Sequence, residues 1–266
     1  MSFTRQTVSN PVSFQGLGLH TGVPVRMTIH PGKDGIRFRL GSDRFLASPE
    51  NVTDTTRSTR LGTIGTVEHL MSAFAGLELT DAEVELDAPE VPGMDGSSTQ
   101  FVEGIQQVGF ESLGENPMLH LYRRVFYHEG SIKVAVAKGN GHWRYVYEAG
   151  SRWPGTQSYE AQSVVDAYPD QIAKARTFAL SEEIPMIMKM GLGKGLDETS
   201  ALILGLDGYE NEERFSDEPA RHKLLDSIGD LYLAGIPIGL LNVVSERSGH
   251  AANVKAAAML KAATQP

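Results

Sequence analysis

The chain has 266 residues, of which 41% are apolar and 21% are charged, as expected for a folded protein of one or two domains. Its formal net charge of −9 argues against a general nucleic-acid-binding protein, because such a protein needs a basic surface. The absence of cysteine excludes disulfides and thiolate metal ligands, and it fits a reducing compartment.

The N-terminal segment MSFTRQTVSNPVSF lacks the apolar core and cleavage site of a signal peptide. No stretch approaches the roughly 18 uninterrupted apolar residues of a transmembrane helix. We therefore expect a cytoplasmic globular protein with no nucleic-acid partner and no transmembrane segment. A monomer is favoured, although the sequence does not determine the oligomeric state.

The first half of the chain begins with short runs of alternating apolar and polar residues, for example 25–29 and 36–40. Glycine and proline separate these runs, which predicts β-strands and hairpins. Apolar residues then recur at helical spacing, which predicts a helix over 66–77. An alternating strand over 82–88, a loop and a short helix over 98–109 follow.

The second half repeats this order after a turn-rich segment, LGENPMLHL, which we interpret as a boundary between domains 1–117 and 118–266. The predicted elements are strands over 123–137, 142–149 and 201–206, an ambiguous stretch over 164–178, and helices over 219–235 and 250–263. Strands followed by helices, twice over, favour an α+β protein with two similar halves. The two halves have no visible sequence similarity.

The ionisable residues gather in short motifs that suit a metal site. His222 and Asp226 are four residues apart in a predicted helix, so both side chains lie on one face and can reach one cation. Asp230 lies a turn further and can orient another group. Catalytic zinc keeps three protein ligands and an open position for water, which makes His69 the natural third ligand. Its neighbour Glu68 can take a proton from a water beside the metal.

Each motif also has an ordinary structural interpretation. A Glu-His dipeptide in a helix is usually a solvated pair, and His-x-x-x-Asp is commonly an exposed ion pair worth roughly a few tenths of a kcal/mol. His250, in the motif SGH, can simply begin a helix. Leu224, Leu225 and Ile228 surround the ionisable row with apolar residues, and unpaired charge is costly at such a surface. This placement favours a metal site, but the spacing alone leaves both interpretations open.

Five segments, TVEHLMSAFAGL, APEVPGMDGSSTQFV, KARTFAL, RHKLLDSIGDLYLAG and SGHAANVK, resemble in order and spacing the motifs of the LpxC family. Members of that family are UDP-3-O-acyl-N-acetylglucosamine deacetylases of lipid A synthesis. The resemblance covers nearly the whole chain, and GLGLHTG is similar to the family's opening loop. It implies two similar α+β domains, each a β-sheet with two principal helices, stacked helix layer to helix layer.

The resemblance implies a zinc-dependent amide hydrolase with His69, His222 and Asp226 as metal ligands. Iron can occupy the same set of two histidines and one carboxylate, and the sequence does not separate the two metals. The implied reaction removes the N-acetyl group from an acylated UDP-N-acetylglucosamine, which is the expected small-molecule partner.

The same resemblance implies roles for further residues. Glu68 would be the general base, and His250, kept cationic by Asp230, would protonate the departing amine. Thr177 would hydrogen-bond the oxyanion.

Three residues are expected on the substrate side of the site. Lys223 and Phe178 would contact the sugar nucleotide or its acyl chain. Lys223 is also expected among the catalytic residues. His20 would lie near the substrate.

The chain departs from the family pattern where the acyl chain is expected. Arg57 and Arg60 lie near a stretch that approaches the substrate in the family. Residues 149–159 lie where the family has an insert lining an acyl passage, but they are mostly small and polar. Two alternatives therefore stand beside the leading interpretation: a paralogue that deacetylates another N-acyl sugar, and a binding protein without catalysis. A binding protein without catalysis is expected to have lost a catalytic or metal-ligand residue, and this chain retains every one of those residues.

Overall fold

Both halves of the chain form a five-stranded sheet in the computed structural model, which describes residues 2–116 and 120–264. The first sheet has the order β2-β3-β8-β4-β5 and comprises β2 (Val12–Leu17), β3 (Pro24–Pro31), β4 (Ile36–Leu40), β5 (Asp43–Leu46) and β8 (Ala82–Leu86). The second has the order β10-β11-β16-β12-β13 and comprises β10 (Val125–Glu129), β11 (Ile132–Lys138), β12 (Trp143–Glu148), β13 (Thr156–Ala161) and β16 (Leu241–Glu246).

The two sheets share one topology. In the first sheet β8 pairs parallel with β4, and in the second β16 pairs parallel with β12. All other neighbours within these two sheets are antiparallel. The predicted domain boundary falls at residues 117 and 118, which lie outside the described residues.

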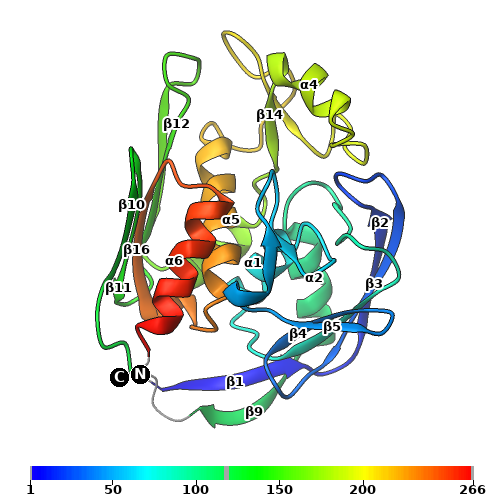
Figure 1. Ribbon diagram of the computed structural model, residues 1–266, viewed down its shortest axis with the longest axis vertical. Helices are drawn as coiled ribbons and strands as arrows, with labels where there is room; N and C mark the ends of the chain where they lie inside the picture. Colours follow the sequence, from blue (N-terminus) through cyan, green and yellow to red (C-terminus); the bar gives the residue numbers. More distant parts are fainter. Residues whose placement is uncertain (1, 117–119, 265–266) are drawn as a thin grey trace.

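Four principal helices lie between the sheets (Figure 1). They are α1 (Glu68–Gly76), α2 (Thr99–Val108), α5 (Glu218–Tyr232) and α6 (His250–Ala262). In each half one helix precedes the parallel central strand and the other follows it. The predicted fold of two similar α+β units, stacked helix layer to helix layer, is confirmed.

Smaller elements complete the described chain. They are β1 (Phe3–Val8), β6 (Val52–Asp54), β7 (Arg60–Leu61), β9 (Phe110–Asn116), α3 (Val164–Ala167), β14 (Phe178–Leu180), α4 (Ile184–Lys189), β15 (Leu202–Leu204), a π-helical turn (Tyr168–Ile172) and short 3-10 turns at Pro49–Asn51, Ser181–Glu183 and Ile238–Leu240. Strand β1 pairs antiparallel with β9. Strands β14 and β15 are parallel and are joined through α4, so they form a small unit at one end of the molecule (Figure 1).

Most predicted elements are present within a few residues of their expected bounds. The ambiguous stretch 164–178 forms α3, the π-helical turn and the start of β14. Strand β13 was not predicted because its sequence, TQSYEA, is largely polar. It is held by antiparallel pairing with β12, a long-range feature that apolar patterning does not report.

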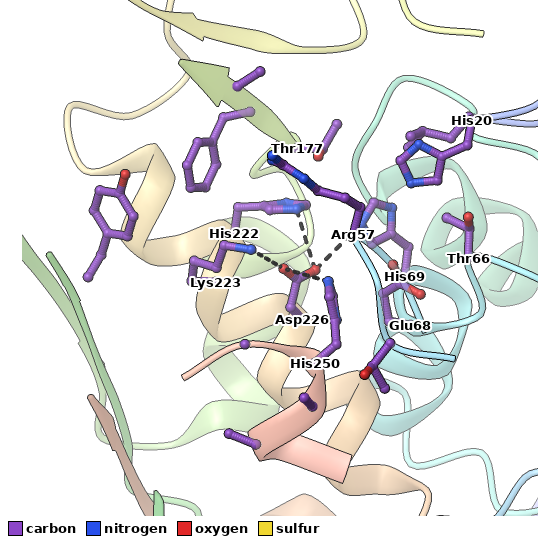
Figure 2. Close-up of a pocket in the computed structure, with 18 of the residues that line it drawn as sticks. His20, Arg57, Thr66, Glu68, His69, Thr177, His222, Lys223, Asp226 and His250 are labelled. Atoms are coloured by element: carbon purple, nitrogen blue, oxygen red, sulfur yellow. Dashed lines mark hydrogen bonds and ion pairs between the residues drawn. The ribbon is translucent and has the colours of Figure 1, made fainter. Parts of the chain in front are cut away.

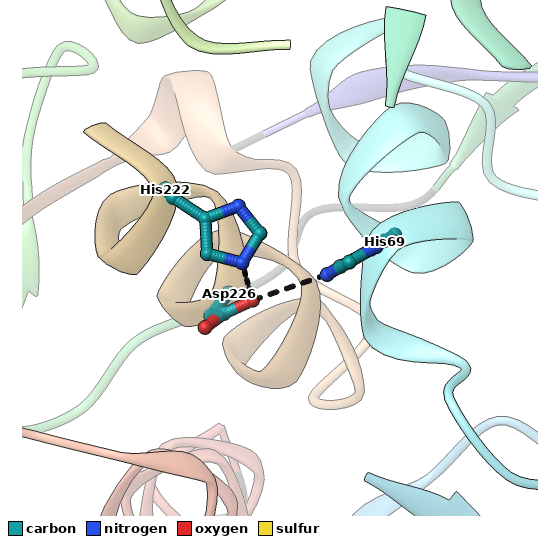
Figure 3. Close-up of side chains that lie close together, drawn as sticks. All are labelled: His69, His222 and Asp226. Carbon is teal, nitrogen blue, oxygen red and sulfur yellow. Dashed lines mark ion pairs between the residues drawn. The ribbon is translucent and has the colours of Figure 1, made fainter. Parts of the chain in front are cut away.

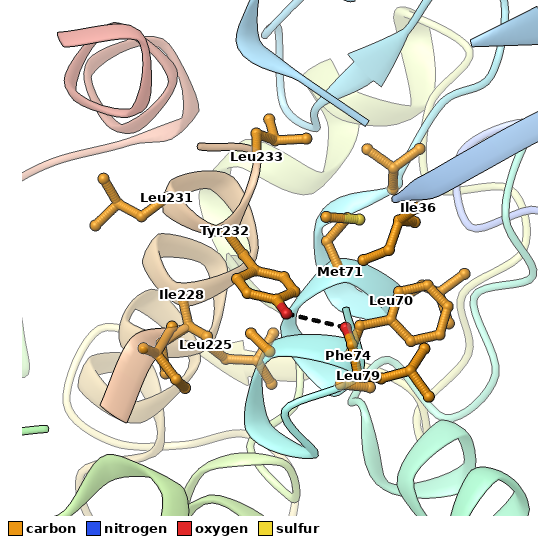
Figure 4. Packing of buried hydrophobic residues seen from close by; sticks show 14 of the residues in the cluster. Ile36, Leu70, Met71, Phe74, Leu79, Leu225, Ile228, Leu231, Tyr232 and Leu233 are labelled. Atoms are coloured by element: carbon orange, nitrogen blue, oxygen red, sulfur yellow. Dashed lines mark hydrogen bonds between the residues drawn. The ribbon is translucent and has the colours of Figure 1, made fainter. Parts of the chain in front are cut away.

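Helices α1 and α5 approach most closely at Gly229. A Cβ atom at this position would overlap the carbonyl oxygen of Glu68, so the contact requires glycine. Apolar side chains of both helices, among them Phe74 and Ile228, are fully buried beside it (Figure 4). The Tyr232 hydroxyl donates to the Leu79 carbonyl across the same interface at 2.9 Å. This close packing brings the start of α1 beside the middle of α5.

We expect Gly229→Ala to lower the free energy of unfolding by about 1–3 kcal/mol, because the added methyl group forces two packed helices apart. Urea denaturation measures this change. Gly208→Ala is the matched control, since a Cβ atom there meets nothing within 4 Å. Equal stability of the two variants would contradict the close helix contact.

Candidate metal centre and catalytic cavity

The helix contact brings His69 of α1 to His222 and Asp226 of α5 (Figure 3). The Nε2 atoms of His69 and His222 lie 3.6 and 3.4 Å from Asp226 Oδ1. The two imidazole rings are nearly perpendicular, with centroids 5.0 Å apart. One potential ligand atom from each residue lies within 4.8 Å of the others, so the three side chains can bind one ion.

The surroundings of His222 and Asp226 favour metal-binding protonation states. His222 Nδ1 donates to the Ala175 carbonyl at 3.1 Å, which leaves Nε2 as the free ligand atom. Burial lowers the pKa of His222 to about 3, so the imidazole is neutral. Burial alone would raise the pKa of Asp226, but its polar surroundings, with the Lys223 ammonium group as the permanent positive charge among them, hold this pKa well below its usual range.

Asp226 provides a test of whether the site fits a cation. Its side chain is about 2% exposed, and Oδ1 has no hydrogen-bond partner. A buried carboxylate oxygen without a partner is costly. A cation bound between the histidine nitrogens and Oδ1 would satisfy it, so the donor set fits a divalent metal with two nitrogen ligands and one oxygen ligand.

Glu68 lies next to His69, and both side chains line one cavity. The Thr59 backbone N–H donates to its Oε2 atom at 2.9 Å, which fixes the carboxyl group. Burial raises the pKa of Glu68, because the surrounding protein disfavours the charged form. A carboxylate with a raised pKa is a better proton acceptor near neutral pH.

His250, the first residue of α6, points its Nε2 atom toward the same centre, 4.0 Å from Asp226 Oδ2. Its Nδ1 atom donates to Asp230 Oδ2 at 3.0 Å. Burial would lower the pKa of His250, but the charge and hydrogen bond of Asp230 outweigh it and raise the pKa to about 9. The imidazolium is therefore protonated at neutral pH and can act as a proton donor.

Asp230 has two further partners, Thr59 Oγ1 at 2.5 Å and Asn253 Nδ2 at 3.0 Å. Neither residue belongs to the predicted site. Asn253 lies three residues after His250, a spacing that places both on one helix face and could have identified it. No pattern in the sequence marks Thr59, which reaches the site from the loop before α1.

We expect Asp230→Asn to move the basic limb of the pH–rate profile down by about 1–3 pH units, since removing a neighbouring opposite charge shifts a pKa by that much. The limb moves to lower pH because His250 must be protonated to donate its proton to the leaving amine. Loss of the Asp230 charge lowers the pKa of His250 from about 9. Measuring kcat/KM against pH for both proteins, at equal metal content, gives the shift. A basic limb at the wild-type position would contradict the role of Asp230.

A cavity of about 610 Å³ contains the predicted site. Nine of the ten predicted residues line it: His20, Glu68, His69, Thr177, Phe178, His222, Lys223, Asp226 and His250. The tenth, Asp230, lies behind His250. Figure 2 shows the labelled side chains converging on this space from both halves of the chain.

Thr177 is held at the cavity by contacts on both sides. Its N–H donates to the Gly96 carbonyl at 2.8 Å, and its carbonyl accepts from the Leu202 N–H at 2.9 Å. The preceding Arg176 forms a buried ion pair with Glu218, with 2.9 Å between Nε and Oε1. These contacts fix the backbone that carries the Thr177 side chain.

Lys223 lies between the ligand set and the expected substrate side. Its Nζ atom is 3.0 Å from Asp226 Oδ2 and 5.4 Å from the centroid of the Phe178 ring. Burial would lower the pKa of Lys223, but the charge of Asp226 outweighs it and raises this pKa above its usual value. A permanent cation therefore adjoins the carboxylate ligand.

Residues 149–159, which the sequence places near the expected acyl chain, belong to the β12–β13 hairpin, and none of them lines this cavity. Phe178, Ala179 and Leu180 of β14 line it.

The described residues contain no helix that is both long and apolar enough to cross a membrane.

Comparisons with known proteins agree with this geometry. The model of a family described as "LpxC: UDP-3-O-acyl N-acetylglycosamine deacetylase" matches residues 5–262. A protein of Aquifex aeolicus named UDP-3-O-acyl-N-acetylglucosamine deacetylase is 36% identical over 261 residues, covering 94% of this chain and 90% of its own. Proteins of the same name from Geotalea uraniireducens and Myxococcus xanthus are each 34% identical, covering 94% and 96% of this chain and 86% and 85% of their own.

Proposed function

This chain belongs to the LpxC family, and we propose that it removes the N-acetyl group from UDP-3-O-acyl-N-acetylglucosamine in lipid A biosynthesis. The observation that carries the proposal is the buried group of His69, His222 and Asp226 at the base of a cavity that also presents Glu68 and His250. A metal site, a base and an acid are the groups that amide hydrolysis at neutral pH requires.

The proposed metal is zinc, held by His69, His222 and Asp226. The two imidazole nitrogens and one carboxylate oxygen suit a catalytic zinc site, although iron(II) accepts the same donors. When bound, the ion supplies Lewis acidity for the amide carbonyl and lowers the pKa of water to about 7.

Glu68 is the proposed general base. Its carboxylate, fixed by the Thr59 N–H, takes the proton from the attacking water. The raised pKa of Glu68 matches this task, since proton acceptance is most effective when the pKa of the base approaches the working pH.

His250 is the proposed general acid. Its Nε2–H faces the centre while Asp230 holds Nδ1, so the proton is available to the departing amide nitrogen. An amine leaves poorly without a proton, and the pKa of about 9 keeps His250 charged until that transfer.

Thr177 is the proposed stabiliser of the oxyanion. Its hydroxyl can donate a hydrogen bond to the developing negative charge, while Lys223, also proposed among the catalytic residues, holds its ammonium group beside the ligand Asp226. One well-placed donor of this kind contributes about 3–4 kcal/mol to transition-state stabilisation.

The proposed substrate side of the cavity includes His20, Phe178 and Lys223. Lys255, which pairs with Glu129 at 3.3 Å, lines the cavity as well, and the ammonium groups of Lys223 and Lys255 suit the diphosphate of a sugar nucleotide. Phe178 offers an aromatic surface for packing.

The proposed domains are 1–117, which carries Glu68 and His69, and 118–266, which carries His222, Asp226 and His250. The active site then lies between them. A monomer suffices for the reaction, because one chain supplies every proposed group. The proposed location is the cytoplasm, which the absence of cysteine fits.

The test is hydrolysis of UDP-3-O-acyl-N-acetylglucosamine by the zinc-loaded protein, followed as acetate release. We expect turnover of this substrate and much less of UDP-N-acetylglucosamine or free N-acyl sugars. Preference for another N-acyl sugar would support a paralogue instead. Failure to hydrolyse any of them, with zinc bound, would leave only a binding protein.

A further inference from the structure

A buried carboxylate that the proposed reaction does not use binds two segments of the cavity wall. Glu90, in the loop between β8 and α2, is about 3% exposed. Its Oε1 atom accepts from the His20 N–H and from the Thr66 hydroxyl, each at 2.8 Å. Its Oε2 atom accepts from the Thr21 N–H at 2.9 Å and from the Thr21 hydroxyl at 2.6 Å. Four donors from two other segments therefore converge on one carboxylate.

The backbone on either side of Glu90 is held by the same two segments. The Gly93 N–H donates to the Leu17 carbonyl at 2.8 Å, and the Val91 N–H donates to the Gly65 carbonyl at 3.1 Å. Hydrogen bonds on both sides fix the path of this loop. The carboxylate of Glu90 is therefore presented to its donors from a constrained backbone.

The first of the two segments is the loop 18–22, which carries His20 to the cavity. Its turn is closed by the Gly22 N–H, which donates to the Gly18 carbonyl at 2.8 Å, and a Cβ atom at Gly18 would overlap Glu90 Oε2. His20 Nδ1 is buried and has no hydrogen-bond partner within residues 2–116 and 120–264. Such an atom is costly to leave unpaired, so a group of the bound substrate is its available partner.

The second segment is the start of α1. Thr66 has φ of 58°, which is uncommon for a residue other than glycine, and its hydroxyl is held by Glu90. Two and three residues later come Glu68 and His69, in the first turn of α1. Figure 2 shows His20, Thr66 and His69 on the same side of the cavity. One carboxylate thus ties the loop that carries His20 to the residue just before the proposed base and metal ligand.

We propose that Glu90 is a positioning residue that holds the His20 imidazole in a fixed place relative to Glu68 and His69. The inference rests on the proposed function, because it concerns how that substrate is held against those groups. Glu90 is not among the residues that line the catalytic cavity, and it acts through the His20 N–H and the Thr66 hydroxyl. A misplacement of about 1 Å in such a site can cost on the order of a hundredfold in rate.

Glu90→Gln tests the proposal, because the side chain keeps its size while one of its two acceptor atoms becomes a donor. We expect kcat/KM for UDP-3-O-acyl-N-acetylglucosamine to fall by about 10–100-fold, with the zinc content of the protein unchanged. Steady-state kinetics and metal analysis of the same zinc-loaded sample measure both. A wild-type kcat/KM in this variant overturns the positioning role while hydrolysis by the wild type still supports the proposed function.

Asp81→Asn is the matched control, since Asp81 is a second buried carboxylate that holds a loop. It is about 1% exposed and accepts from the Gly35 N–H at 2.7 Å and from the Thr80 hydroxyl at 2.6 Å. It does not line the catalytic cavity. We expect this substitution to lower stability toward urea and to keep the wild-type kcat/KM. An equal fall in kcat/KM for both variants overturns the proposal, because any loosened loop would then suffice.

His20→Ala distinguishes positioning of the imidazole from a general loss of structure. It removes the imidazole and keeps the N–H that donates to Glu90. If Glu90 acts through His20, Glu90→Gln must lower kcat/KM much less in the His20→Ala background than in the wild type, because the two effects are coupled. An equal fall in both backgrounds overturns the proposal.

Hydrogen exchange measured by mass spectrometry gives a readout that does not depend on turnover. We expect Glu90→Gln to exchange faster than the wild type in peptides that cover residues 17–23, since the His20 and Thr21 amides lose their acceptor. Asp81→Asn should instead exchange faster around Gly35. Unchanged exchange of residues 17–23 overturns the anchoring by Glu90. Absence of hydrolysis by the wild type overturns the proposed function and the role of Glu90 in it, whatever the exchange shows.

Discussion

Glu68→Gln is expected to lower kcat by about 10²–10⁴-fold while leaving the bound metal in place. The amide keeps the size of the carboxyl group and can still accept the hydrogen bond from the Thr59 N–H. It cannot take a proton, and general base catalysis contributes a factor of this size. Steady-state kinetics on the acylated sugar nucleotide, together with metal analysis of the same sample, measures both parts of the expectation.

Glu111→Gln is the matched control for this substitution, because Glu111 is exposed on β9 and does not line the cavity. The control should retain wild-type turnover. If Glu68→Gln did so as well with metal bound, another group would have to be the base.

His250→Ala is expected to lower kcat by a similar factor of about 10²–10⁴. The departing amine then lacks a proton donor, and Asp230 is left buried without the imidazolium that it holds at 3.0 Å. The basic limb of the pH–rate profile that reports His250 should vanish as well. Kinetics across the pH range, at equal metal content, tests both expectations.

For this variant His128→Ala serves as the control, since His128 is exposed on β10. Its turnover and pH profile should match the wild type. Retention of the wild-type basic limb by His250→Ala would assign that limb to a different group.

The sequence predicted the row of His222, Asp226 and Asp230 from helical spacing alone. Spacing could not distinguish an exposed ion pair from a metal site, because both require the same residues one turn apart. Burial decides between them. All three side chains are at most about 2% exposed, and an ordinary surface pair does not leave a buried oxygen without a partner.

Other parts of the site depend on contacts between distant segments. Thr59 donates to Asp230 across 171 positions of sequence, and Gly229 allows α5 to approach Glu68. Neither residue belongs to a local pattern, so only the assembled fold reveals its role. The contact between Glu90 and His20 is of the same kind, with 70 positions between the two residues.

The twofold repetition of the fold could be predicted only in outline. Strands followed by helices recur in both halves, but the shared strand order, with one parallel pair in each sheet, comes from pairing between segments far apart in the chain. Core positions accept many apolar residues of suitable size. Two halves can therefore keep one topology without visible sequence similarity.

The most direct test of the account is metal content and activity measured on the same protein before chelation, after chelation and after addition of zinc. We expect one zinc ion per chain, loss of deacetylation of UDP-3-O-acyl-N-acetylglucosamine when the metal is removed, and its return with zinc. His222→Ala should neither bind the ion at full stoichiometry nor recover. Full activity of the metal-free protein, or full zinc binding by His222→Ala, would contradict a catalytic metal held by His69, His222 and Asp226.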